Sequence, residues 1–175
     1  ALTTINLPLL TEIGGDLSIY YNDALTIIDF PLLASVGGSL SIGGGEDGIS
    51  YTNNALTTVN LPLLTEIGEN LSIGRTFSVG EEGEEQANLT YSNPVLATID
   101  LSLLGSIGGY LQVEGNPALT TIDLPLLTEI GGYIQILNNS ALTTIDLPLL
   151  TSVEEFDLNI RDNDALTTVG LPLLA

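Results

Sequence analysis

The sequence predicts an all-β chain whose short strands stack into a parallel β-solenoid. Two observations predict this fold. A unit of about 23 residues recurs along the chain, and each unit contains short alternating apolar pieces, such as TTIDL and YIQIL, separated by Pro and Gly-Gly. A strand this short cannot bury its own apolar face, so it finds cover by stacking on the same strand of the next unit.

The repeats define the domain organisation as a single domain, residues 1–175, of six full coils and a partial seventh. Two insertions, residues 43–50 and 74–90, follow the same motif position and lengthen the second and third coils. The sixth coil carries one extra residue, for which Phe156 is the candidate. The coils span residues 1–23, 24–54, 55–94, 95–117, 118–140, 141–164 and 165–175.

Seven positions of each repeat are aliphatic and predict the interior. Counted from the first residue of each copy, they are positions 2, 5, 7, 10, 13, 17 and 19. In the fifth copy they are Leu119, Ile122, Leu124, Leu127, Ile130, Ile134 and Ile136.

Position 22 is asparagine in every complete copy and predicts a structural ladder. A side-chain amide at a tight corner can donate to the coil below and accept from the coil above. The ladder residues are Asn22, Asn53, Asn93, Asn116, Asn139 and Asn163.

The order L-x-x-I-x-L-P-x-L-x-x-I-G-G-x-L-x-I-x-x-N resembles the receptor L-domain repeat, a leucine-rich-repeat relative. It is closer still to the L-domain-like repeats of fungal cell-wall proteins and prokaryotic cell-surface proteins. The resemblance covers the whole chain. It implies a right-handed β-helix, secretion, and binding or structural work without catalysis. The disulfide-rich neighbours of the receptor domains are absent here, which favours a microbial surface protein.

Composition excludes several function classes. The chain has 22 acidic residues, 2 basic residues and a formal net charge of −20, so it repels nucleic-acid phosphates. It has no His and no Cys, which removes the commonest general base and the thiolate metal sites. No apolar run is long enough for a membrane span. Carboxylate pairs in a cleft and a nucleophile beside a base are also missing from the pattern, so we expect no enzyme and no cofactor.

The two insertions follow the same corner on consecutive coils, so we expect them to lie side by side. They hold weak calcium-ligand candidates, because Ca²⁺ takes six to eight oxygen ligands. The alternative is a pair of solvated acidic loops, which could also contact a partner. The calcium candidates are Glu46, Asp47, Glu81, Glu82, Glu84 and Glu85. Asn70, Asn88 and Asn138 lie in N-glycosylation sequons.

Position 12 alternates between acid and hydroxyl along the copies. Glutamates on adjacent coils would stand about 4.8 Å apart, where like charges are destabilising, and the alternation doubles that distance. Because the chain has almost no cations, we expect its stability to rise with salt or divalent cations. The row reads Glu12, Ser35, Glu66, Ser106, Glu129 and Ser152.

Threonine at position 4 suggests a minor alternative, an ice-binding solenoid. Six of seven copies carry it, but position 6 on the same face is Asp or Asn in six of seven. That polar row disfavours ice binding, and the β-propensity of threonine accounts for the threonines.

Position 9 is leucine in all seven copies, where L-domain-like repeats usually carry a polar residue. If these side chains point outward, they form an apolar seam for association; if the corner turns inward, they widen the core. The sequence leaves both open. The seam residues are Leu9, Leu32, Leu63, Leu103, Leu126, Leu149 and Leu173.

The sequence therefore predicts a non-enzymatic, extracellular structural or adhesive repeat protein of a microbial cell surface. Its expected partners are its own copies, other surface proteins or glycans. No polar capping repeat precedes the first copy or follows the seventh, so either the chain is a stretch of a longer array or its open ends pair in a filament or lattice. The alternative is a ligand-binding ectodomain module that uses the acidic insertions.

Overall fold

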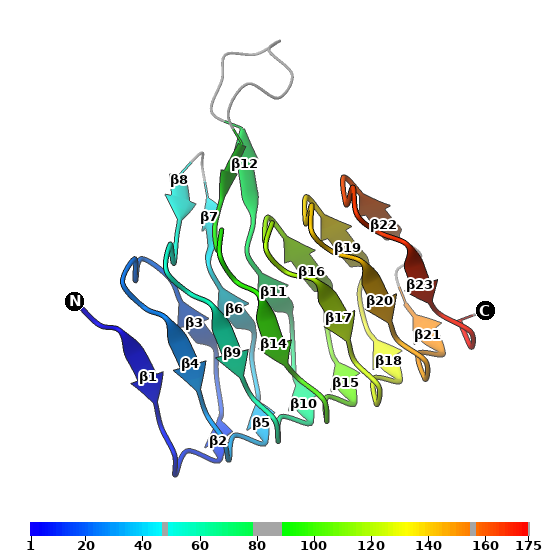
Figure 1. Ribbon diagram of the computed structural model, residues 1–175. Coiled ribbons are helices and arrows are strands. Elements are labelled where there is room, and N and C mark those ends of the chain that lie inside the picture. The colour runs from blue at the N-terminus through cyan, green and yellow to red at the C-terminus, as the bar shows by residue number, and fades with distance from the viewer. Residues whose placement is uncertain (47–48, 79–88, 155–156, 175) are drawn as a thin grey trace.

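The computed structural model describes residues 1–46, 49–78, 89–154 and 157–174. Within them the chain is all-β and contains no helix. Short strands lie side by side in rows that run from the N-terminal to the C-terminal end of the molecule (Figure 1). Each complete repeat contributes one strand to each of three rows.

The first row consists of two sheets of parallel strands, with a break between β14 and β17. Its first sheet contains β1 (Thr4–Asn6), β4 (Ile27–Asp29), β9 (Thr58–Asn60) and β14 (Thr98–Asp100). Its second sheet contains β17 (Thr121–Asp123), β20 (Thr144–Asp146) and β23 (Thr168–Gly170).

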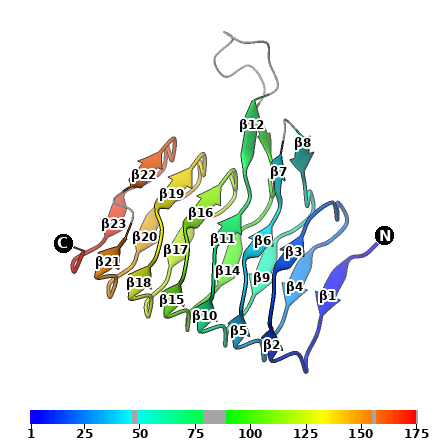
Figure 2. The ribbon, with the colours of Figure 1, turned by 180° about the vertical axis from the view of Figure 1, so that it is seen from behind.

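The second and third rows are continuous six-stranded parallel sheets, and Figure 2 shows the molecule from behind. The second row holds β2 (Glu12–Ile13), β5 (Ser35–Val36), β10 (Glu66–Ile67), β15 (Ser106–Ile107), β18 (Glu129–Ile130) and β21 (Ser152–Val153). The third row holds β3 (Leu17–Ile19), β6 (Leu40–Ile42), β11 (Leu71–Ile73), β16 (Leu111–Glu114), β19 (Ile134–Leu137) and β22 (Leu158–Arg161).

The strands pair in the register of the sequence repeat. Ile107 faces Ile130, and Ile130 faces Val153, each pair 23 residues apart. On the third row Ile134 faces Leu158, a separation of 24 residues. The extra residue of the sixth repeat therefore lies between Val153 and Leu158. Phe156, the predicted extra residue, lies outside the described residues.

Aliphatic side chains from all three rows form one core. All seven interior positions predicted for the fifth repeat are buried. Burial weakens at the first repeat, where Leu2 and Leu7 are exposed although Leu25 and Phe30, their equivalents in the second repeat, are buried. Parallel sheets of short stacked strands around an aliphatic core are compatible with the predicted β-solenoid.

Glycine pairs lie at the corner between the second and third rows, where successive repeats approach closely. A Cβ atom at Gly68 would collide with the carbonyl oxygen of Gly37, and one at Gly108 with the carbonyl oxygen of Gly68. Only glycine lets the backbones stack at this distance.

The two insertions form antiparallel hairpins that project from the same edge of the molecule (Figure 1). The first pairs β7 (Gly44–Glu46) with β8 (Ile49–Tyr51), and the second pairs β12 (Thr76–Ser78) with β13 (Leu89–Tyr91). Strands β8 and β12 lie next to each other, as expected for insertions at one corner of consecutive repeats.

Neighbouring leucines at the corner before the second row allow a matched test of the core. Leu127 is fully buried, whereas Leu126 is 43% exposed. We predict that Leu127→Asp destabilises the fold by at least about 4 kcal/mol, because it places an unpaired charge in an aliphatic interior. Leu126→Asp should keep the wild-type melting temperature within a few degrees. Thermal unfolding followed by circular dichroism compares the two, and equal melting temperatures would contradict this assignment of the core.

Candidate functional site

A turn between the first and second rows determines where the position-9 leucines point. In the fifth repeat the backbone N–H of Leu127 donates to the carbonyl of Leu124 at 3.2 Å, which closes a β-turn with Pro125 and Leu126 at its centre. Proline has the φ angle that the first central position requires. The turn returns Leu127 to the core and leaves Leu126 on the outside.

The same turn recurs in the other repeats and lines up the exposed leucines into a ridge. The hydrogen bond between positions 10 and 7 is also present in the first, second, third, fourth, sixth and seventh repeats. We call the seven position-9 leucines the leucine ridge. Their side chains are between 38% and 85% exposed, so the structure places them outside the core. The members are Leu9, Leu32, Leu63, Leu103, Leu126, Leu149 and Leu173.

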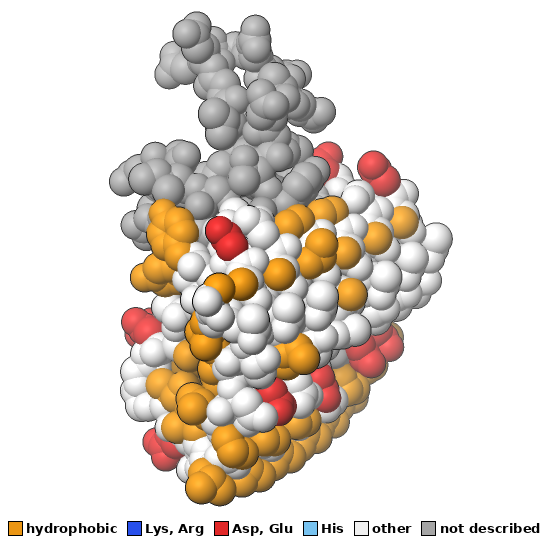
Figure 3. All heavy atoms as spheres, turned by 60° about the vertical axis from the view of Figure 1, so that its left-hand side comes forward, with side chains coloured by type: hydrophobic (Ala, Val, Ile, Leu, Met, Phe, Trp, Pro, Cys, Tyr) orange, Lys and Arg blue, Asp and Glu red, His pale blue; other side chains and the backbone are white. Residues whose placement is uncertain are grey.

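The ridge is a continuous apolar surface feature. Hydrophobic side chains gather in a row along the lower edge of the molecule in Figure 3, where these turns lie. Successive repeats are one strand spacing apart, about 4.8 Å, so neighbouring ridge leucines leave little room for water between them. Single exposed leucines are ordinary on protein surfaces, but a contiguous apolar row of this length is typical of an interface.

The position-22 asparagines form a hydrogen-bonded ladder at another corner. Asn116 is fully buried, and its Nδ2 donates to the carbonyl of Ile73 in the preceding repeat at 2.9 Å. Its Oδ1 accepts a hydrogen bond from Nδ2 of Asn93 at 3.0 Å. Its own Nδ2 also lies 3.3 Å from Oδ1 of Asn139 in the next repeat. The ladder therefore joins side chains to each other as well as to the backbone.

The hydrogen bonds that the asparagine Oδ1 atoms accept come from a different repeat than the sequence predicts. Oδ1 was expected to accept from the following coil, yet Oδ1 of Asn139 accepts from the backbone N–H of Asn116, in the preceding repeat, at 3.0 Å. The backbone just before four of the six ladder residues is left-handed. Gly115 and Asn138 have φ angles of 70° and 55°, in the left-handed region that suits Gly and Asn. Oδ1 of Asn53 and Oδ1 of Asn93 also accept from the preceding repeat, although neither asparagine follows a left-handed residue, so the direction of these bonds does not require this turn.

The other members repeat this pattern from end to end. In four of them Nδ2 donates to the backbone carbonyl at position 19 of the preceding repeat, at 2.9 to 3.1 Å. The donors are Asn53, Asn93, Asn139 and Asn163. In the first repeat of the sequence, Nδ2 of Asn22 donates to the carbonyl of Tyr20. The arrangement satisfies buried polar groups and leaves the central amides inaccessible to a ligand.

Polar rows on the strands alternate charged and neutral residues. Glu66 pairs with Ser35 on one side and Ser106 on the other, as the position-12 alternation implies. Position 6 alternates too, a pattern that the sequence reasoning missed: Asn60 lies between Asp29 and Asp100, and its Nδ2 donates to Asp29 at 2.6 Å. The signal was visible in the sequence as an Asn-Asp-Asn-Asp order in the first four repeats.

The predicted calcium candidates fall in the insertions. Asp47, Glu81, Glu82, Glu84 and Glu85 lie outside the described residues, and for Glu46 only the backbone is described, at the end of β7. Within the described part of the chain, no three acidic side chains gather as a metal-binding group.

Two of the three sequons lie on described residues. Asn70 is half-buried, and its Oδ1 accepts a hydrogen bond from the backbone N–H of Tyr110 at 3.1 Å. Asn138 is half-buried beside the asparagine ladder. Asn88 lies outside the described residues.

Comparisons with protein-family models, with curated proteins and with solved structures found no match to this chain. Among the described residues no helix is long and apolar enough to cross a membrane.

The central and terminal members of the asparagine ladder should differ in their contribution to stability. We predict that Asn116→Ala lowers the free energy of unfolding by about 2 to 4 kcal/mol, because it removes one of the two acceptors of the buried Asn93 Nδ2 and the Nδ2 donor to the Ile73 carbonyl. The matched change Asn22→Ala, at the more exposed end, should cost less than about 1 kcal/mol. Urea unfolding measures the free energy of unfolding of both variants. Equal losses would show that burial does not raise the contribution of a ladder asparagine to stability.

Proposed function

We propose that this chain is a non-enzymatic structural repeat protein of a microbial cell surface, and that its copies associate side by side along the leucine ridge. The observation that carries the proposal is the row of seven exposed leucines, one in each repeat. A structural role requires a surface that repeats at a fixed interval, and in-register stacking provides it.

The architecture that we propose for this role is a single right-handed β-solenoid of six full coils and a partial seventh. Three rows of parallel strands in the register of the 23-residue repeat support the solenoid. The right hand follows from the resemblance of the repeat to L-domain-like repeats. The same resemblance is the basis for an extracellular location.

The ridge is suited to binding a second copy of itself. Every copy carries leucines at the same spacing, so two ridges related by a two-fold axis place equivalent side chains against each other. The rest of the surface disfavours contact, because each copy carries a net charge of −20. Apolar burial along the ridge therefore competes with electrostatic repulsion, and salt should favour association by screening the repulsion.

The second candidate function is a ligand-binding module that uses the insertions. The observation that favours it is the side-by-side arrangement of β8 and β12, which brings the two hairpins together at one edge. Saturable ligand binding that disappears when both insertions are shortened to the 23-residue repeat, with self-association unchanged, would favour this function over the structural one.

We predict that Leu63→Asn, Leu103→Asn and Leu126→Asn together abolish lateral association but change the melting temperature little, because all three side chains lie outside the core. The matched control changes three exposed threonines outside the ridge, Thr57, Thr65 and Thr128, to Asn. Sedimentation velocity at physiological salt, over a range of protein concentrations, measures the association.

The control variant should associate like the wild type. Wild-type protein that stays monomeric at the highest soluble concentration would rule out the ridge as a self-association surface. Severe destabilisation of the leucine variant would show instead that the ridge contributes mainly to folding.

A further inference from the structure

The first row of strands is interrupted at one step, between β14 and β17. Elsewhere in this row, two backbone hydrogen bonds flank each pair of strands. The N–H of Leu61 donates to the carbonyl of Asp100 at 3.0 Å, and the N–H of Leu124 donates to that of Asp146 at 3.1 Å. Within the described residues the equivalent bond from Leu101 to Asp123 is not formed. We call this gap the slot.

The upstream bonds show the same interruption. The N–H of Ala97 donates to the carbonyl of Thr57 at 3.0 Å, and that of Thr143 to Thr120 at 2.9 Å. No bond of the described chain joins Thr120 to Ala97. Two strand edges therefore face each other across the slot without pairing. Unpaired strand edges are the usual place at which a further strand is added.

The other two rows remain bonded at this step. Ser106 pairs with Glu129 on the second row, and Leu111 pairs with Ile134 on the third. Separation of β14 from β17 is thus confined to one of the three rows.

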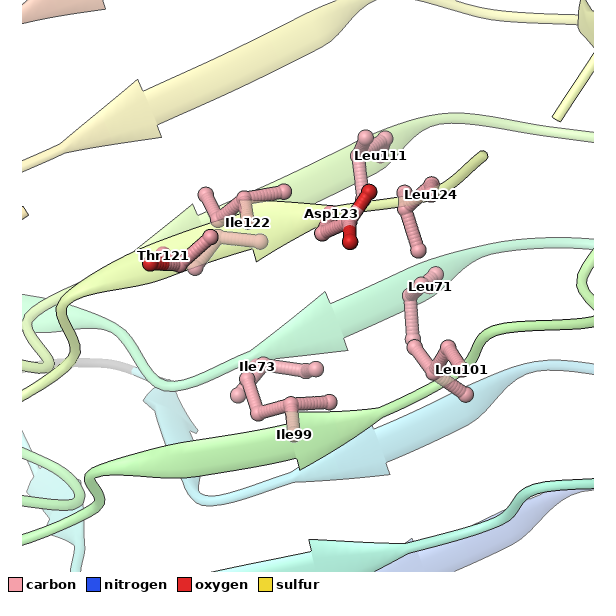
Figure 4. Close-up of a pocket in the computed structure, with 10 residues that line it drawn as sticks. Leu71, Ile73, Ile99, Leu101, Leu111, Thr121, Ile122, Asp123 and Leu124 are labelled. Atoms are coloured by element: carbon pink, nitrogen blue, oxygen red, sulfur yellow. The ribbon is translucent and has the colours of Figure 1, made fainter. Parts of the chain in front are cut away.

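The floor of the slot is apolar. Behind it lies a cavity of about 20 Å³, and Figure 4 shows Ile99 and Ile122 on strands at its two sides, with Leu111 behind. Ile99 is half-buried, whereas its equivalents Val59 and Ile145 are almost fully buried. The core is therefore accessible at this step.

Two carboxylates flank the slot on the outside. The position-6 alternation ends here, because Asp100 is followed by Asp123. Asp100 accepts a hydrogen bond from the backbone N–H of Ser102 at 3.1 Å. This N–H is present because serine replaces the proline of the other repeats. Asp123 and Asp146 are paired in a closed ladder, so adjacent carboxylates alone do not open the row.

We propose that the slot binds an extended peptide segment as an additional strand, with an aliphatic side chain facing the cavity and an amide or basic side chain facing out between Asp100 and Asp123. The molecule contains a template for this occupant. Strand β9 lies between β4 and β14, with Val59 buried and Asn60 outside between Asp29 and Asp100. A strand of the same pattern in the slot restores both the ladder and the alternation.

Entry of the strand opens the slot further about the two bonded rows. An inserted strand needs β14 and β17 to stand two strand spacings apart, about 9.6 Å. The cavity now has room for about one water molecule. The gain comes from backbone pairing on both edges and from burial of the apolar side chain.

The test uses the whole chain and a fluorescein-labelled peptide, acetyl-KTTVNLK-amide, in a fluorescence polarisation titration. One control peptide replaces the inward valine by aspartate and the other replaces the outward asparagine by aspartate. Saturable binding of the first peptide, at least about tenfold tighter than both controls, supports the proposal. Absence of saturable binding, or equal binding of the controls, overturns it.

A disulfide that closes the slot tests the location. The chain has no cysteine, so Ala97→Cys with Thr120→Cys gives a single cross-strand pair of exposed positions. The matched pair, Thr120→Cys with Thr143→Cys, crosses the closed step between β17 and β20. Oxidation should weaken peptide binding at least about tenfold in the slot pair and leave the matched pair unchanged. Unchanged binding by the oxidised slot pair overturns the proposal.

Amide hydrogen exchange gives a second readout that needs no variant. The N–H groups of Leu101 and Thr120 should exchange fast in the free protein and slow markedly when the peptide is bound. Protection of other amides, with these two unaffected, would place the peptide elsewhere and refute the slot as its site.

Discussion

In-register parallel stacking is the constraint on which the rest of the structure depends. Each side chain meets the same position of the next repeat about one strand spacing away. Aliphatic residues placed this way form the core, and asparagines form a ladder in which each amide bonds the next. Tyr110 and Tyr133 stack with ring centroids 4.8 Å apart and planes 9° apart. In-register stacking also brings carboxylates at the same position close together, which is unfavourable. Glu therefore alternates with Ser at position 12, and Asn alternates with Asp at position 6 in the first four repeats.

Much of the fold could be predicted because the repeat displays its own register. The apolar positions, the asparagine ladder and most of the glycine corner are visible as columns of similar or identical residues. The sequence leaves open whether the position-9 leucines face the core or the solvent, because the inward and outward alternation of a strand does not continue through a turn. The turn itself decides it: Pro125 occupies the first central position, and the bond from Leu127 to Leu124 turns Leu126 outward. The repeat pattern alone does not show the direction of the ladder's acceptor bonds, because an asparagine side chain can reach either neighbouring repeat.

The slot could not be predicted, because no single residue in the sequence marks it. Ala97, Ser102 and the step from Asp100 to Asp123 each depart slightly from the repeat, and none of them breaks a strand by itself. The second row, by contrast, stays paired through the same repeats. The interruption is thus confined to one row.

The slot lies next to the leucine ridge, because Leu101 and Leu124 at the slot come two residues before Leu103 and Leu126 of the ridge. Burial of the ridge is the favourable term in association, and repulsion between acidic copies opposes it. For the proposed function, this balance predicts assembly where salt screens the charge and dispersal where salt is low.

The central claim, that copies meet at the leucine ridge, can be tested by covalent trapping, since the chain has no cysteine of its own. Leu126→Cys places one thiol on the ridge, and Thr143→Cys places one on an exposed position of the first row. Both variants are oxidised at equal concentration in physiological salt, and covalent dimer is measured by gel electrophoresis without reductant. The account predicts dimer from the Leu126 variant and little from the Thr143 variant; equal dimer from both, or none from the ridge variant, would contradict it.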